Sequence, residues 1–214
     1  VRSSAASDVY KRQLLARSRV WPSAFVLARA AAARRQRAKA YGRKLLLSQF
    51  QHPGLTLHGI DEPHAYPARL HEMGFKLVLL TRDNPVRQAL SFFHGSQRAF
   101  HHRNGDKKGF VPLEVDPIQL LAGAWIIETE TRQLREMVRS VPHLFLSYER
   151  DLLDPARHEA TVTQVCEYIG IDPAPVATDL VKLAPTTLGE TLANFDEVAA
   201  LFRQTRYSEY LEDR

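Results

Sequence analysis

Cysteine and long apolar runs are almost absent from this sequence. Its 214 residues include one cysteine, Cys166, which excludes an internal disulfide and a cysteine-based zinc site. The longest apolar stretches, such as Leu77–Leu80, are strand-sized and fall well short of the ~20 residues that a membrane-spanning helix needs. Charged residues make up 25% and hydrophobic residues 44% of the chain, which excludes wholesale disorder. We therefore expect a soluble α/β protein without disulfides, and we expect it in the cytoplasm.

Acidic residues are missing from one long segment. Residues 14–44 contain none, whereas the chain after residue 44 carries more acidic than basic residues. The nine basic residues of this segment are Arg17, Arg19, Arg29, Arg34, Arg35, Arg37, Lys39, Arg43 and Lys44. Such an asymmetry predicts an anionic partner near the basic end of the chain, or a solvated helical face without a partner.

The first residues of the chain resemble a sequence that does not come from a protein. Ser3–Gln13 reads SSAASDVYKRQ, and eleven codons of a common transposon-type sequencing adapter encode these residues in order. We therefore interpret residues 1–13 as a non-native, adapter-derived segment and leave them out of the fold prediction. The alternative is a disordered natural N-terminus. On the first interpretation the natural N-terminus is missing, and no signal peptide or anchor can be recognised.

Hydrophobic patterns predict helices that alternate with short strands. Helices are expected over residues 23–40, 62–73, 85–100, 117–140, 155–169 and 188–204, strands over 44–48, 75–81 and 143–147, and an exposed loop over 101–115. Gly42, Gly74 and Gly170 are expected to end the helices that precede them. Strands separated by helices predict a three-layer α/β domain with a parallel sheet and flanking helices.

Two of these elements carry further expectations about burial. The run Phe75–Thr81 is almost continuously apolar, which predicts a strand buried on both faces of the sheet. The long helix over 117–140 is expected to bury one apolar stripe. The residues of that stripe are Ile118, Leu121, Trp125, Leu134 and Val138.

The most informative stretch for function joins a strand to the following helix. Arg82 stands at the carboxyl end of the strand, and Ser91 lies on the helix over 85–100. Open α/β sheets bind ligands at this edge, close to a helix N-terminus that favours anions. A guanidinium can clamp a phosphate through two donors, and a serine hydroxyl adds a third. The simpler alternative is an ion pair of Arg82 at the helix start and no specific role for Ser91.

Four parts of the chain resemble sulfotransferases that use 3′-phosphoadenosine 5′-phosphosulfate (PAPS). The stretch Leu79–Ser91, with its Arg-Gln-Ala-Leu-Ser sequence, is similar to the 3′-phosphate-binding segment of that family. The other parts are Gly42–Leu46, Phe145–Leu153 with its Tyr-Glu-x-Asp-Leu sequence, and the C-terminal pair Asn194–Val198 and Gln204–Tyr207. All four occur in the family's order and spacing. The resemblance is to the bacterial carbohydrate type and implies a P-loop NTPase-like fold.

The resemblance implies roles for individual side chains. Arg82 and Ser91 would hold the 3′-phosphate of PAPS, and Arg206 would add charge from the C-terminal loop, unless it is a surface arginine. Tyr148 aligns with a tyrosine that contacts the adenine in some relatives, and a buried core tyrosine is the alternative. Lys44 stands where many relatives carry a lysine near the acceptor site.

The catalytic base is left unassigned by the resemblance. The family's histidine two positions after the lysine is replaced by Leu46 here. The remaining candidates are Lys44, Glu62 and His64, with His58 in the same region. His101 and His102 have no third ligand at metal-site spacing, so no metal is expected.

The implied reaction is the transfer of a sulfuryl group from PAPS to a hydroxyl of a carbohydrate or glycolipid, without a metal. The family's Gly/Ser/Thr-rich phosphosulfate loop does not occur between residues 14 and 81. We therefore interpret residues 14–214 as a partial sulfotransferase domain without its first strand and that loop, and expect little transfer activity. Nucleic acid is not expected as a partner. Two alternatives stay open: a polyanion-binding module that uses the Arg-rich helix, and a P-loop kinase-like phosphotransferase.

Overall fold

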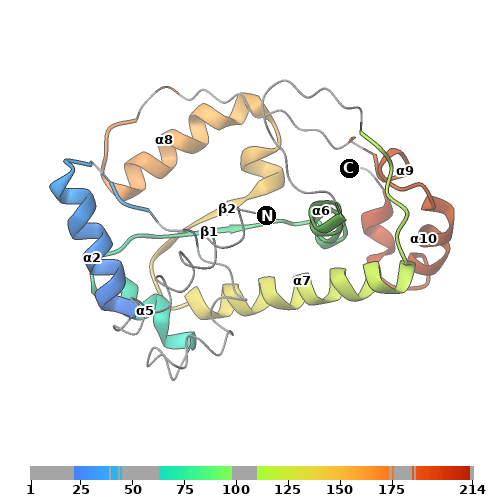
Figure 1. Cartoon of the computed structure of the whole chain (residues 1–214), viewed down its shortest axis with the longest axis horizontal. Coiled ribbons are helices and arrows are strands. Elements are labelled where there is room, and N and C mark those ends of the chain that lie inside the picture. The colour runs from blue at the N-terminus through green and yellow to red at the C-terminus, as the bar shows by residue number, and fades with distance from the viewer. Residues whose placement is uncertain are drawn as a thin grey trace, which may run out of the picture. The chain divides into compact units, whose positions relative to one another are not determined.

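The protein combines many helices with a small parallel sheet (Figure 1). The computed structural model describes residues 22–38, 40–42, 44, 63–97, 110–173, 175, 185 and 187–212. Strands β1 (Leu77–Thr81) and β2 (His143–Ser147) pair side by side in a two-stranded parallel sheet. The α-helices are α2 (Pro22–Arg35), α5 (Tyr66–Glu72), α6 (Pro85–Gln97), α7 (Pro117–Val138), α8 (His158–Ile169), α9 (Leu188–Thr191) and α10 (Phe195–Phe202). Shorter turns are η1 (Pro63–Ala65), the π-helical η2 (Tyr148–Leu152), η3 (Pro155–Arg157) and η4 (Arg206–Leu211).

Local sequence signals set the ends of α5, α6 and α8. Asn84 caps α6 by accepting the backbone N–H of Arg87 at 2.9 Å, next to the proline that begins the helix. Gly74 and Gly170 follow α5 and α8 with φ of 86° and 79°, a backbone conformation that favours glycine. The predicted helices over 62–73, 85–100 and 155–169 are therefore confirmed for the residues that the structure describes.

Helix α2 ends earlier than the sequence indicated. It stops at Arg35, so the expectation that Gly42 ends it is wrong. Arg37 adopts a φ of 57°, and the backbone N–H of Ala38 reaches the carbonyl oxygen of Ala33 at 3.0 Å. This hydrogen bond closes the helix as a glycine turn would. Of the strand predicted over 44–48, Lys44 is described and is not in a strand, and the rest lies outside the described residues.

Strand β1 is buried on one face only. Leu79 and Thr81 are buried, whereas Val78 is 42% and Leu80 49% exposed. Alternate residues of a strand point to opposite faces, so one whole face of β1 is open. The expectation of burial on both faces is therefore wrong, because no described element covers that face of the two-stranded sheet.

The chain divides into two compact units, each with its own core. The first consists of the described residues up to Leu79, of Leu134–Leu144 and of Gln164–Pro173. Its core joins α5 to the end of α7, with Tyr66, Leu70 and Met137 buried together. None of the helices described here is long and apolar enough to cross a membrane.

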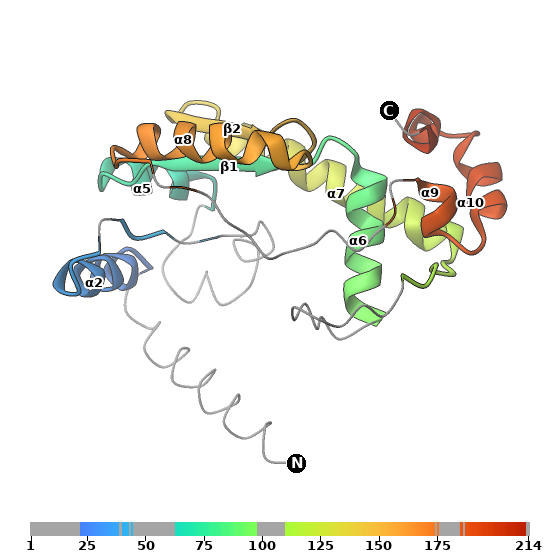
Figure 2. The ribbon, with the colours of Figure 1, turned by 90° about the horizontal axis from the view of Figure 1, so that it is seen from above.

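The second unit consists of the described residues of Leu80–Gln133, Phe145–Thr163 and Ala174–Arg214. Its core lies where α9 and α10 pack beside the first half of α7, close to α6 (Figure 2). Leu120 and Ala124 of α7 are fully buried there, while Ile118 is 71% and Trp125 54% exposed. The predicted stripe is therefore wrong at Ile118 and Trp125. Its other members, Leu121, Leu134 and Val138, are packed against the cores or buried.

The helix predicted over 188–204 is interrupted in the structure. It is divided into α9 and α10 at residues 192–194, where Leu192 forms a parallel bridge with Leu113. The backbone N–H of Leu113 donates to Thr191 O at 2.9 Å, and that of Ala193 donates to Leu113 O at 2.8 Å. These bonds to a distant segment replace the hydrogen bonds of a continuous helix. The first part of the loop predicted over 101–115 lies outside the described residues, and its last part is this extended segment.

Candidate functional site

Two residues that the sequence singled out meet where the strands end. Because β1 and β2 are parallel neighbours, Arg82 and Tyr148 follow them at the same edge of the sheet. The guanidinium carbon of Arg82 lies 4.0 Å from the centre of the Tyr148 ring. This distance is typical of a cation stacked on an aromatic face. Both residues belong to the second unit, so one compact body carries the contact.

Glu149 also contacts Arg82 and the residue that follows it. One of its oxygens lies 3.8 Å from Arg82 Nε, and the other accepts the backbone N–H of Asp83 at 2.8 Å. The side chains of Arg82 and Glu149 are 24% and 26% exposed. We call Arg82, Tyr148 and Glu149 the strand-end cluster.

The guanidinium of Arg82 keeps unused donors. Its Nε atom is buried without a hydrogen-bond partner, because 3.8 Å is too long for a hydrogen bond to Glu149. Its two terminal nitrogens make no hydrogen bond to any residue that the structure describes. Stacked on Tyr148, the planar group therefore presents a fork of donors that suits a phosphate or carboxylate.

A second network, made of hydrogen bonds, links the ends of the two strands. The buried Ser147 donates its hydroxyl to Asp83 Oδ2 at 2.5 Å and its backbone N–H to Asp151 Oδ2 at 2.7 Å. Arg150 donates two hydrogen bonds to Asp151, at 2.9 and 2.8 Å. The bonds from Arg150 and from the Ser147 N–H lower the pKa of Asp151 below its usual range, against the effect of burial. Asp151 thus has a structural role, because its carboxylate ties η2 to Ser147 at the end of β2.

Ser91 lies on α6 and its side chain is exposed. No hydrogen bond in the described part of the protein joins it to Arg82. The pairing of Ser91 with Arg82 on one phosphate stays a prediction.

Arg206 takes part in a separate cluster with α7. Its guanidinium is ion-paired with Glu128 and donates to the Tyr207 hydroxyl at 3.0 Å, which in turn donates to Glu128 at 2.6 Å. The hydrogen bond to Tyr207 raises the pKa of Arg206, and burial together with Glu128 raises the pKa of the Tyr207 phenol. Arg206 is therefore already satisfied by protein groups, and its contact with a phosphate stays a prediction.

The candidates for the catalytic base give no site in the described residues. Lys44 and His64 are exposed and belong to the first unit. Glu62, His58, His101 and His102 lie outside the described residues. Within the ranges that the structure describes, no group of three or more histidine, cysteine, aspartate or glutamate side chains could hold a metal ion.

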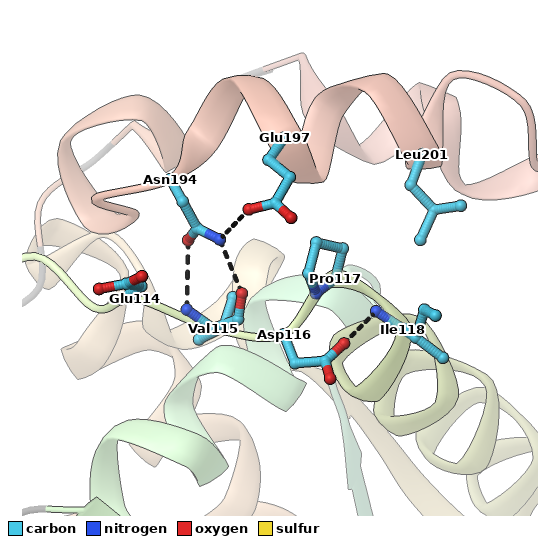
Figure 3. A pocket seen from close by; sticks show the side chains of 8 residues that line it. All are labelled: Glu114, Val115, Asp116, Pro117, Ile118, Asn194, Glu197 and Leu201. Atoms are coloured by element: carbon cyan, nitrogen blue, oxygen red, sulfur yellow. Dashed lines mark hydrogen bonds between the residues drawn. The ribbon is translucent and has the colours of Figure 1, made fainter.

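A pocket of about 620 Å³ lies in the second unit, and none of the residues predicted for the site is among those that line it (Figure 3). Its lining residues are Glu114, Val115, Asp116, Pro117, Ile118, Asn194, Glu197 and Leu201. Three of them are carboxylates and none is basic, so the lining disfavours an anionic nucleotide. Asn194, part of the C-terminal resemblance, donates to Val115 O at 2.7 Å and accepts the Val115 N–H at 3.2 Å. Its visible role is structural.

Sequence reasoning missed Glu149, Ser147 and Asp151 as parts of the site. The Tyr-Glu-x-Asp sequence after β2 indicates the family resemblance but not these contacts. A serine at the end of a strand with an aspartate four residues later could have indicated the backbone bond of Ser147. The contact of Glu149 with Asp83 spans 66 residues of sequence and leaves no local signal.

Comparison of the whole chain with protein-family models, curated proteins and solved structures found no match. The motifs in the sequence and the geometry of the strand-end cluster are therefore the observations that bear on function.

Proposed function

We propose that residues 14–214 belong to a PAPS-dependent sulfotransferase of the bacterial carbohydrate type, with a three-layer, P-loop NTPase-like α/β fold. Arg82 binds the 3′-phosphate of the nucleotide, Ser91 adds a hydroxyl donor, and Tyr148 contacts the adenine. The acceptor is a hydroxyl of a carbohydrate or glycolipid. Both reactants are compatible with a cytoplasmic enzyme.

One observation carries this proposal. Arg82 follows a parallel strand and precedes the capped start of α6. Its guanidinium lies over the Tyr148 ring, and its terminal nitrogens form no hydrogen bond with any described residue. A cation held in this way loses little freedom when it binds an anion, and the positive end of α6 favours negative charge nearby. Arg82 and Tyr148 come from two different segments that both resemble the sulfotransferase family.

The proposed reaction needs no metal, and every bond and proton in it is accounted for. The bond between sulfur and the 5′-phosphate oxygen breaks, and a bond between sulfur and the acceptor oxygen forms. The acceptor proton leaves to a general base, for which Lys44, Glu62 and His64 stay candidates. Because residues 14–81 contain no Gly/Ser/Thr-rich loop, we expect the chain to bind the 3′-phosphate end of the nucleotide and to show little transfer.

The test is nucleotide binding by the purified chain and by the Arg82→Ala variant. Adenosine 3′,5′-bisphosphate should bind and raise the melting temperature, whereas ATP should not. Loss of a charge-assisted pair costs about 1.5–3 kcal/mol, so Arg82→Ala should weaken binding by roughly 10- to 100-fold. Arg132→Ala removes an exposed arginine of the same unit and should leave binding unchanged. Equal stabilisation by ATP and the bisphosphate would favour the kinase-like alternative, and a bisphosphate affinity insensitive to Arg82 would contradict the proposal.

A second candidate function follows from α2. Arg29, Arg34 and Arg35 of this helix are exposed, and none is paired with a carboxylate in the described parts of the chain. Such a helix can bind a polyanion through charge alone, with an affinity that falls steeply as salt increases. Polyanion binding that falls with salt and ignores the bisphosphate would favour this function over the first.

A further inference from the structure

The carboxylate of Glu149 lies beside two donors at the edge of the sheet where we propose that an anionic ligand binds. It accepts the Asp83 N–H at 2.8 Å and lies 3.8 Å from Arg82 Nε. That N–H is the backbone donor immediately after Arg82, at the edge of the sheet where ligands of α/β proteins bind. Glu149 is therefore the counter-ion of Arg82 among the described residues.

We propose that Glu149 is a specificity-determining residue of the strand-end cluster, where its negative charge competes with the ligand's anionic group for Arg82. This inference rests on the proposed function, because it assumes that Arg82 binds the phosphate of a nucleotide. It assigns Glu149 a role in selecting ligands by charge.

The geometry favours competition over simple support of Arg82. The Nε–Oε1 distance is too long for a hydrogen bond, so Glu149 does not fix the guanidinium through a directed bond. Tyr148 already holds the planar face at 4.0 Å. A phosphate bound at the terminal nitrogens would share the charge of Arg82 with the Glu149 carboxylate, and the repulsion between the two anions grows with the charge of the ligand. Both side chains are only about one quarter exposed, so solvent screens this repulsion incompletely.

The substitution Glu149→Gln isolates this charge. Glutamine has nearly the same shape, and its amide oxygen can still accept the Asp83 N–H, so the end of the sheet keeps its hydrogen bond. Adenosine 3′,5′-bisphosphate should bind roughly five- to tenfold more tightly to Glu149→Gln than to the wild-type chain. Adenosine 5′-monophosphate lacks the 3′-phosphate, and its affinity should change less than about twofold.

The experiment measures both affinities by isothermal titration calorimetry, with thermal unfolding as a check that each variant is folded. Glu159→Gln removes one exposed negative charge from the first turn of α8 and is the matched control. Tighter bisphosphate binding by Glu149→Gln alone supports the inference, since a merely structural role cannot strengthen binding of one ligand. Equal or weaker binding by Glu149→Gln, with a wild-type affinity that depends on Arg82, overturns the inference and leaves the proposed function standing. Absence of bisphosphate binding by both wild type and Glu149→Gln overturns both.

Discussion

Substitution of Asp151 tests the hydrogen bonds beside the strand-end cluster, through their effect on the free energy of unfolding. Its carboxylate accepts the backbone N–H of Ser147, a residue only 2% exposed, at 2.7 Å. In Asp151→Ala that buried N–H loses its acceptor, which costs about 2–3 kcal/mol of the free energy of unfolding. The hydroxyl of Thr161 donates to the backbone oxygen of Asp151 and is unaffected by the substitution. The whole loss therefore comes from the side chain.

Two further variants separate the hydrogen bond from the ion pair. Asp151→Asn keeps an oxygen that can accept the Ser147 N–H, so it should lose about 1 kcal/mol. Arg150→Ala should lose less than Asp151→Ala, because Arg150 is 54% exposed and solvent screens its ion pair. Urea unfolding followed by circular dichroism measures all three losses. A loss for Arg150→Ala as large as that for Asp151→Ala would refute the reasoning.

The same residue predicts a dependence on pH. Arg150 and the Ser147 N–H lower the pKa of Asp151 in the folded protein. A group with a lowered folded-state pKa stabilises the fold above its unfolded pKa of about 4, and this stabilisation disappears as the pH falls through the folded-state value. The stability difference between wild type and Asp151→Asn should therefore be full at pH 6 and shrink below pH 4. A difference that stays constant down to pH 2 would contradict the assignment.

Two other substitutions test the packing of the second unit. Asn194→Ala removes both hydrogen bonds to the buried backbone of Val115 and should cost about 2 kcal/mol of unfolding free energy in urea. Gln204→Ala, which removes an exposed amide bonded to Ala200 O, is the control and should cost much less. Burial and Glu128 raise the pKa of Tyr207, so the melting temperature of the wild type should fall as the pH rises above about 10, where the unfolded tyrosine ionises. Tyr207→Phe should make that fall smaller, and an identical fall in both proteins would contradict the raised pKa.

Positions of helices and strands were predictable wherever local chemistry decides them. Asn84 with the following proline, and glycines at Gly74 and Gly170, determine helix ends through bonds within a few residues. Arg37 escaped prediction because arginine rarely adopts a positive φ, yet here it closes α2. The break between α9 and α10 could not be predicted for a different reason. Leu113, which forms hydrogen bonds with the residues at the break, lies more than seventy residues earlier in the chain.

Burial was the weaker part of the prediction. An apolar stretch such as Leu77–Leu80 indicates a strand but does not say how many of its faces are covered. On α7, both Leu120 and Ile118 are apolar, and only the packing of the second unit's core decides that Leu120 is buried.

For the candidate site, apolar runs in the sequence were enough to predict that Arg82 and Tyr148 each follow a strand. The parallel pairing of β1 and β2 decided that these residues meet, because parallel neighbours end at one edge of the sheet. Tertiary structure alone decided that Glu149 lies against Arg82 and that Arg206 is bound by Glu128. These contacts join residues far apart in the chain, and local sequence patterns hold no information about which distant charges the fold brings together.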